Sequence, residues 1–300
     1  MDLGGSLRRF GPWLLLVAAA LLFAPAPASR AGPDLSAPVP VTLPGYDGDA
    51  MEPFLSRDGR VLLFNNRNAP PDRTDLRWAR RIDDTTFRYA GLVEGANSPA
   101  LDGVPTLSAD GRLCFISVRA YRETLGTVFC ADWRDGRSGP PQLQADASPR
   151  IPGRLVFDLE LAADGRTAVL ADGRFTGGPV PAAADLRLAR LTGGRLVLSP
   201  ADDRLFAAVN TPALEYAPAL SPDGLTLAFT RMTGPGLFAS AGIYLARRPS
   251  AEAPFGPPAR IRAIPGFAEA PTFSPDGRWI YFHRRIGGRF SIWRVATPSS

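Results

Sequence analysis

Two kinds of charged residue recur at corresponding places along this chain, and both could do chemistry. An acidic residue shortly precedes one apolar run in most segments, and an arginine ends the next run. Two carboxylates can cleave a glycosidic bond, one as general acid and the other as base or nucleophile. An arginine beside a carboxylate can instead form a structural bidentate ion pair. The acids are Glu52, Asp102, Glu215 and Glu269, with either Asp158 or Glu160 as the fifth member, and the arginines are Arg67, Arg119, Arg174, Arg231 and Arg284.

The segments that contain these residues are copies of one repeat. Each copy has an Asp-Gly dipeptide, and successive dipeptides are 52 to 59 residues apart. The two strongest copies are SPDGLTLAFTR from Ser221 and SPDGRWIYFHRR from Ser274. A period of this length is typical of repeat architectures. The five aspartates are Asp58, Asp110, Asp164, Asp223 and Asp276.

The internal pattern of the repeat predicts β-strands. An apolar-alternating run precedes each Asp-Gly and a nearly continuous apolar run follows it, which indicates two strands joined by a tight turn. A third run and a weaker fourth run follow in most copies. Four antiparallel strands in a unit of about 50 residues are typical of one blade of a β-propeller. The sequence therefore predicts an all-β, five-bladed β-propeller.

The two ends of the sequence predict how the propeller closes. The last copy reaches Ser300 after its third strand, whereas residues near Val39 to Pro44 align with a fourth strand. We expect this N-terminal segment to complete the last blade, because closure covers strand edges that would otherwise be exposed. The alternative is six blades, with the sixth in the longest interval, around Arg195 to Ala208.

The SPDG motif, followed by LAF or IYF and then an arginine, resembles the WD40-like propeller repeat of the TolB family of bacterial periplasmic proteins. The resemblance covers residues 39 to 298. It implies the propeller fold and an exported location. TolB proteins add an N-terminal α/β domain, for which the sequence between Ser29 and Val39 has no room.

The acids and arginines lead to three functional hypotheses. Because the first two strands of a blade are antiparallel, the acid and the arginine lie at the same mouth of the central channel. There they could fasten neighbouring blades together, or form a polar mouth for an anionic or carbohydrate-like ligand. A glycoside hydrolase of the same fold would use carboxylates at this mouth, with Glu52, Asp102 and Glu215 as the candidates.

The composition argues against other chemistries. His283 is the single histidine, which disfavours a Ser-His-Asp triad and a multi-histidine metal site. The sequence contains no lysine, which excludes a Schiff-base lysine and a P-loop. We therefore expect no cofactor and no metal. The net charge of +5 does not require a nucleic-acid partner.

The two cysteines, Cys114 and Cys130, fall on the second and third predicted strands of one repeat. They face each other if the hairpin turns symmetrically about Arg122. An oxidising compartment would then allow a disulfide, and two buried thiols are the alternative. Counting along the strands leaves both possibilities open.

The N-terminus indicates an exported protein. Arg8 and Arg9 precede the apolar run Trp13 to Ala24, and Ala26-Pro27-Ala28 offers a cleavage site. We predict a signal peptide over residues 1–28, a linker over 29–38 and one propeller domain over 39–300. The main prediction is a periplasmic or secreted monomer without enzymatic activity, a scaffold that binds a protein partner or a small polar or carbohydrate ligand in the envelope, with no nucleic acid and no membrane span after cleavage. The alternative is a carbohydrate-active enzyme.

Overall fold

The computed structural model describes residues 37–68, 73–234 and 240–298, all of which belong to the unit from Leu35 to Ser300. Almost every regular element is a β-strand, and nearly all pairings are antiparallel. The predicted signal peptide (1–28) and most of the predicted linker (29–38) lie outside the described residues. In the described part of the chain, no helix has the length and apolar character needed to cross a membrane.

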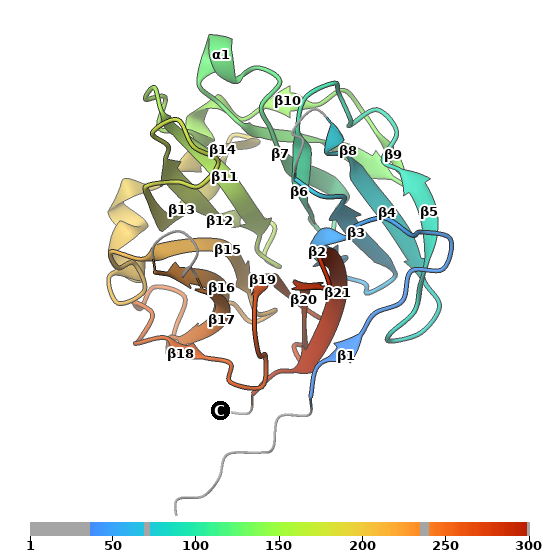
Figure 1. Ribbon diagram of the computed structural model, residues 1–300. Coiled ribbons are helices and arrows are strands. Elements are labelled where there is room, and N and C mark those ends of the chain that lie inside the picture. Colours follow the sequence, from blue (N-terminus) through green and yellow to red (C-terminus); the bar gives the residue numbers. More distant parts are fainter. Residues whose placement is uncertain (1–36, 69–72, 235–239, 299–300) are drawn as a thin grey trace, which may run out of the picture. The chain divides into compact units, whose positions relative to one another are not determined.

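The strands form four sheets in which consecutive strands pair with one another (Figure 1). The first repeat forms β2 (Met51–Leu55), β3 (Val61–Asn65), β4 (Leu76–Arg81) and β5 (Phe87–Leu92). The second forms β6 (Asp102–Leu107), β7 (Arg112–Ser117), β8 (Val128–Arg134), β9 (Arg137–Ser138) and β10 (Gln142–Leu143). The fifth forms β19 (Ala268–Phe273), β20 (Trp279–Ile286) and β21 (Arg289–Ala296), to which β1 (Val39–Pro40) is added.

The third and fourth repeats share the remaining sheet. The third repeat forms β11 (Arg154–Leu161), β12 (Thr167–Arg174), β13 (Ala183–Thr192) and β14 (Arg195–Leu198). The fourth forms β15 (Leu214–Leu220), β16 (Thr226–Thr233), β17 (Ser240–Arg247) and β18 (Ala259–Arg260). The two are joined by one parallel pairing, Ala184 with Leu214. The short helices are α1 (Tyr121–Thr124), η2 (Ala145–Ala147) and η3 (Pro200–Phe206).

The SPDG motif folds into a turn because its side chains satisfy the local backbone. In the fourth repeat, Asp223 Oδ1 accepts hydrogen bonds from Ser221 Oγ at 2.5 Å and from the Leu225 N–H at 2.9 Å. Ser221 Oγ also accepts a bond from the Thr226 N–H at 2.8 Å. Gly224 has a φ of +70°, which glycine adopts without steric cost. The motif therefore fixes the hairpin between the first and second strands of a repeat.

The first strands of the five repeats, β2, β6, β11, β15 and β19, surround a common centre (Figure 1). Each contacts the first strand of the next repeat, and β19 contacts β2. The apolar cores lie between repeats: one cluster joins Leu62 and Phe64 of the first repeat to Tyr281 and Ile292 of the last. The second strand of a repeat is therefore packed on both faces, with Leu62 and Phe64 in one core and Leu63 in another, which explains its nearly continuous apolar sequence.

The N-terminal segment pairs with the last strand. Val39 and Pro40 lie opposite Arg294 and Trp293. The Val41 N–H continues the ladder with a 2.9 Å hydrogen bond to the Ile292 carbonyl. The proposed sixth-blade interval contains β14 and η3 in place of a further four-stranded sheet.

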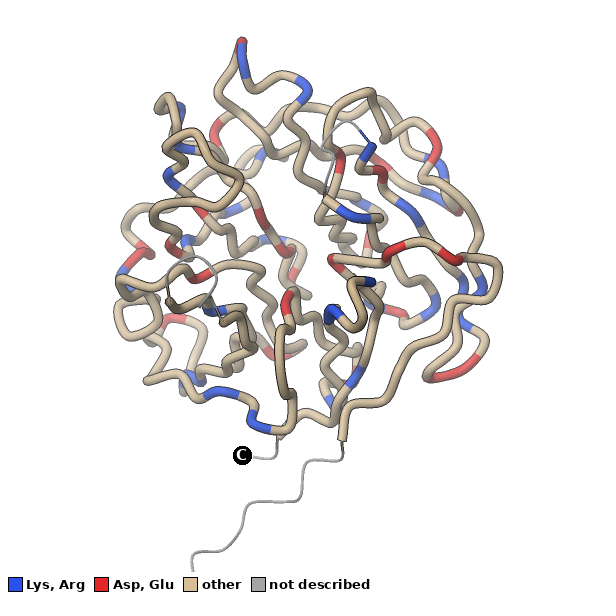
Figure 2. The backbone as a smooth tube through the Cα atoms, in the orientation of Figure 1, with Lys and Arg blue, Asp and Glu red and all other residues tan. Residues whose placement is uncertain are grey.

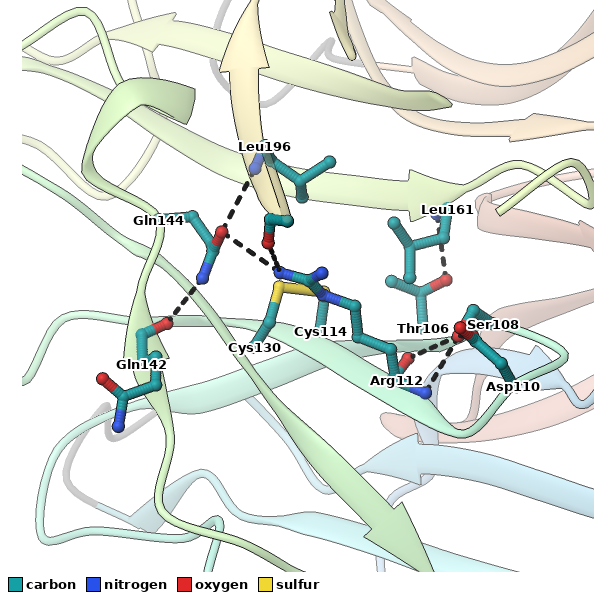
Figure 3. Close-up of a disulfide and its surroundings, with 11 residues drawn as sticks. Thr106, Ser108, Asp110, Arg112, Cys114, Cys130, Gln142, Gln144, Leu161 and Leu196 are labelled. Atoms are coloured by element: carbon teal, nitrogen blue, oxygen red, sulfur yellow. Dashed lines mark hydrogen bonds between the residues drawn. A yellow bond between two sulfur atoms is a disulfide. The ribbon is translucent and has the colours of Figure 1, made fainter. Parts of the chain in front are cut away.

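Cys114 and Cys130 form a disulfide between β7 and β8 (Figure 3). They are direct partners in the strand register, with Cα atoms 4.1 Å apart. Both lie in the apolar core between the second and third repeats. The symmetric hairpin is the arrangement that the structure adopts, although helix α1 lies within it.

Candidate functional site

Each repeat places one residue of its first strand at the centre of the fold, at a β-bulge. In four repeats it precedes a proline and has a positive φ of 48 to 56°. Asp158 occupies this place in the third repeat, next to the register shift in β11. The five residues line the narrow central passage, and they are Glu52, Val104, Asp158, Ala217 and Ala270. Two of the five repeats thus place a carboxylate where the others have a small or apolar side chain.

A cavity of about 220 Å³ opens at this end of the passage. Three carboxylates line it, from Glu52, Asp158 and Glu269. Asp158 and Glu269 are only 6% and 9% exposed. Figure 2 shows acidic positions on the strands around the centre. The other lining residues are Met51, Asn68, Val104, Phe157, Phe175, Pro179, Val180, Pro181, Leu214, Tyr216 and Met232.

A hydrogen-bond chain connects the carboxylate of Glu269 to the backbone of Glu52. Glu269 accepts from the Tyr216 hydroxyl on Oε1 and faces His283 Nε2 with Oε2 at 3.2 Å. The other ring nitrogen of His283, Nδ1, accepts the backbone N–H of Glu52 at 3.1 Å. Asn68 Nδ2 lies 3.4 Å from Oε1 of Glu52. Glu269 therefore has a donor on each oxygen, whereas Glu52 and Asp158 face the cavity.

Burial and mutual repulsion raise the pKa values of the site. Burial raises the pKa of Asp158 well above its ordinary value, and the charges of Glu52 and Glu269 add to this effect. Burial also raises the pKa of Glu52; Glu269 adds to the rise, while His283 and Asn68 oppose it. Three neighbouring carboxylates resist being ionised together. The site therefore retains a proton that a general acid could donate while another carboxylate acts as a base.

Two predicted site residues, Asp102 and Glu215, lie elsewhere and are fully buried. Asp102 accepts from the Ser98 N–H and hydroxyl and from Arg119 at 2.5 Å. Glu215 makes the same set of bonds with Thr211 and with Arg231, at 2.7 Å from the guanidinium. Each pair lies within one repeat, so these ion pairs fasten a loop to its own sheet and do not join neighbouring blades. Asp102 and Glu215 are also removed from the list of hydrolase candidates, of which only Glu52 lines the cavity.

The remaining arginines do not form a ring around the cavity. Arg67 pairs with Asp49 at 2.8 Å. Arg284 donates to the Pro265 carbonyl at 3.1 Å and lies over the Trp293 ring. Arg174 is exposed at the end of β12. Among the described residues that line the cavity, none is an arginine.

The predicted acids occupy different positions relative to the bulge of the first strand. The reference position is the positive-φ residue that precedes the proline of the first strand. Glu52 lies at this position, Glu269 lies one residue before it, and Asp102 and Glu215 lie two residues before it. These offsets send the side chains to different surroundings. The dipeptides Glu52-Pro53, Val104-Pro105, Ala217-Pro218 and Ala270-Pro271 were the signal that could have aligned the repeats. With that alignment, Glu52 and Asp158 become departures from the repeat.

Glu160 lies two residues beyond Asp158 on β11 and does not line this cavity. Its Oε2 accepts from Thr272 Oγ1 at 2.9 Å, and its Oε1 is 3.4 Å from Arg57. Burial raises its pKa to about 7, against the opposing effect of Arg57. Of the two residues considered for the third repeat, Asp158 therefore belongs to the site and Glu160 does not. Among the described residues, no group of three or more His, Cys, Asp or Glu side chains could hold a metal ion.

Comparison with known proteins gives no match to a family model and none to a curated protein sequence. Solved structures do match. A putative exo-beta-1,3-galactanase from Bifidobacterium bifidum s17 is 13% identical over 87% of this chain and 94% of its own, with a TM-score of 0.58. Zg3597, a family 117 glycoside hydrolase from Zobellia galactanivorans, is 15% identical over 88% and 89%, with a TM-score of 0.54. These similarities show a β-propeller-like fold.

TolB from Acinetobacter baumannii also matches, at 14% identity and a TM-score of 0.45. The match covers 84% of this chain but only 55% of the TolB chain. The resemblance to the TolB repeat thus stays a prediction, beyond the propeller-like fold itself.

The main functional prediction, a scaffold without enzymatic activity, was wrong. The matched structures are mostly glycoside hydrolases, including one of family 43 at a TM-score of 0.51. At such low identity this likeness concerns the fold alone.

Proposed function

We propose that this chain is a carbohydrate-active enzyme that hydrolyses a glycosidic bond in the cavity lined by Glu52, Asp158 and Glu269. The observation that supports this most directly is the gathering of three carboxylates from three repeats in one cavity, where the pKa of two of them is raised. Paired carboxylates of different protonation state are what glycoside hydrolysis requires.

The environments of the three acids suggest their roles. Asp158 is the general acid, because burial and two neighbouring carboxylates keep it protonated. Glu52 is the base or nucleophile, since it is less buried and its pKa is raised less. Glu269 is held by Tyr216 and His283 and lies beside the other two acids in the cavity wall.

The walls of the cavity suggest an uncharged sugar as the substrate. Phe157 packs edge-on against Phe175, with ring centroids 5.6 Å apart, and also contacts Tyr216. Such aromatic and apolar walls suit the C–H face of a sugar ring. The described lining residues include no arginine, and the sequence has no lysine, so a carboxylate on the substrate would meet only negative charge.

We also propose that the fold has five blades in a closed ring and that the protein is exported. Five blades are supported by the five first strands around one centre, and closure of the ring is supported by the pairing of β1 with β21. Export to the periplasm or beyond is supported by the disulfide, since disulfides persist in oxidising compartments. We propose that the protein acts there as a monomer on a carbohydrate ligand.

A turnover screen tests the proposed function. The full chain is incubated with a panel of neutral and acidic oligosaccharides, beside the variants Glu52→Gln and Asp158→Asn. We expect hydrolysis of a neutral substrate, and a loss of about 10²- to 10⁴-fold in each variant. Glu160→Gln is the matched control, because it removes a buried carboxylate of the same strand outside the cavity. Equal activity in wild type and both cavity variants, or no hydrolysis of any substrate, would overturn the proposal.

A further inference from the structure

His283, the single histidine of the chain, is completely buried on β20. Its Nδ1 accepts the Glu52 N–H at 3.1 Å, and its Nε2 lies 3.2 Å from Glu269 Oε2. Because Nδ1 accepts a hydrogen bond, the neutral ring carries its hydrogen on Nε2 and donates it to Glu269. The imidazole therefore joins the backbone of one cavity acid to the side chain of another.

Other repeats make the first of these bonds without a histidine. Asn65 Oδ1 accepts the Val104 N–H at 2.9 Å, and Thr230 Oγ1 accepts the Ala270 N–H at 3.1 Å. In each case a side chain on the second strand holds the positive-φ residue of the next repeat. A threonine hydroxyl is sufficient for this structural bond. The contact between repeats therefore does not require the second hydrogen bond of His283, from Nε2 to Glu269.

We propose that His283 is a positioning residue of the active site, which fixes Glu52 and Glu269 relative to each other by accepting the Glu52 N–H on Nδ1 and donating from Nε2 to Glu269. This inference rests on the proposed hydrolase function. Tyr216 on one oxygen of Glu269 and His283 on the other hold this carboxylate in place beside the other two acids of the cavity. His283 thus joins Glu269 to the backbone of Glu52.

Protonation of the ring would break this arrangement. An imidazolium carries hydrogens on both nitrogens, so its Nδ1–H would oppose the Glu52 N–H. Burial lowers the pKa of His283, but the Glu269 hydrogen bond and the charges of Glu52 and Glu269 outweigh it and raise the pKa. The charged groups around the imidazole are these two acids, with Asp158 beyond them. The Phe290 ring packs against His283, and the guanidinium groups of Arg67 and Arg285 lie over the ring of Phe290. We therefore expect the Glu52 N–H to lose its hydrogen bond to Nδ1 when the pH falls below the pKa of His283.

Imidazole ¹⁵N NMR of the full chain tests the bonding without any substrate. One histidine gives one pair of ring signals, so no assignment is needed. Above the ring pKa we expect hydrogen on Nε2 and a bare Nδ1, and Glu269→Gln should lower that pKa. Hydrogen on Nδ1, or a pKa unchanged in Glu269→Gln, would overturn the inference. This result is independent of turnover, so it remains decisive even if the hydrolase proposal fails.

His283→Thr tests the positioning role, because it copies Thr230. The variant keeps an acceptor for the Glu52 N–H but cannot reach Glu269. We expect a folded variant of lower thermal stability, because threonine leaves a cavity and removes the donor to Glu269, with a kcat lower by about 10- to 100-fold, KM little changed, and a shifted acid limb of the pH profile. Thr230→Val is the control: it should lower stability and leave the pH profile in place. A His283→Thr variant with wild-type kcat and pH profile would show that the histidine is only structural.

Discussion

Thr272 Oγ1 donates a 2.9 Å hydrogen bond to Oε2 of Glu160 and so connects the fifth repeat to the third across the centre of the fold. Arg57 of the first repeat reaches the other oxygen of the same carboxylate at 3.4 Å. Three repeats that are distant in sequence therefore meet at one buried acid. Glu160 is thus a buried acid that holds repeats together outside the cavity. Its raised pKa makes the free energy of unfolding depend on pH.

The buried Glu160 should make the protein less stable at neutral than at mildly acidic pH. Burial raises its pKa to about 7, well above the ordinary value of 4.5 for a glutamate, so the folded state binds the proton more tightly than the unfolded state does. Between these two pH values the free energy of unfolding should fall with rising pH, by up to about 3 kcal/mol. Denaturant unfolding of wild type and Glu160→Gln at pH 5 and pH 7.5 measures this. The variant should show a flatter dependence, and equal slopes would contradict the assignment.

The pH profile of hydrolysis should report the charge of Glu269. A general acid works only when protonated, so activity should disappear as the pH rises through the raised pKa of Asp158. Glu269→Gln removes one of the negative charges that raise this pKa. The alkaline limb of kcat/KM should therefore move to lower pH in the variant. An unchanged or upward-shifted limb would show that Glu269 does not act on Asp158.

The buried ion pair between Arg119 and Asp102 should contribute more to stability than the partly exposed pair between Arg67 and Asp49. Arg119→Ala leaves the fully buried Asp102 without its cation, and loss of one partner of a buried pair costs about 3 to 5 kcal/mol. Arg67→Ala is the matched control, because its pair with Asp49 is partly exposed and should be worth about 1 kcal/mol or less. Chemical denaturation compares the two variants. Similar losses would contradict the structural role of Asp102.

The disulfide should contribute to the stability of the second repeat. Cys114 and Cys130 are 16 residues apart, and closing a loop of this size in the unfolded chain is worth about 3 kcal/mol. A double variant, Cys114→Ala with Cys130→Ala, should be less stable by about this amount or more, because both side chains also fill the core. Reducing agent should destabilise the wild type and leave the variant unaffected. A wild type that is insensitive to reduction would contradict the prediction.

The sequence by itself determined the repeated strand pattern and its turns. Ser-x-Asp-Gly forms its turn through contacts within a few residues, and the apolar runs around it need only a buried environment. Such local rules act in every copy, so five copies could be recognised together. The pairing of residues 39–40 with the last strand followed from the same pattern, because the final copy lacks a fourth strand.

Only the tertiary structure decided which acids share a site. A shift of one residue along a strand turns a side chain to the other face, and the bulges before Pro53 and Pro271 add further offsets that counting does not reveal. Asp102 and Glu215 thus face an arginine of their own sheet, while Glu52, Asp158 and Glu269 converge from β2, β11 and β19. The raised pKa values of Glu52 and Asp158 depend on burial and on the charges of neighbouring carboxylates. Both quantities exist only when distant repeats are packed around the same centre.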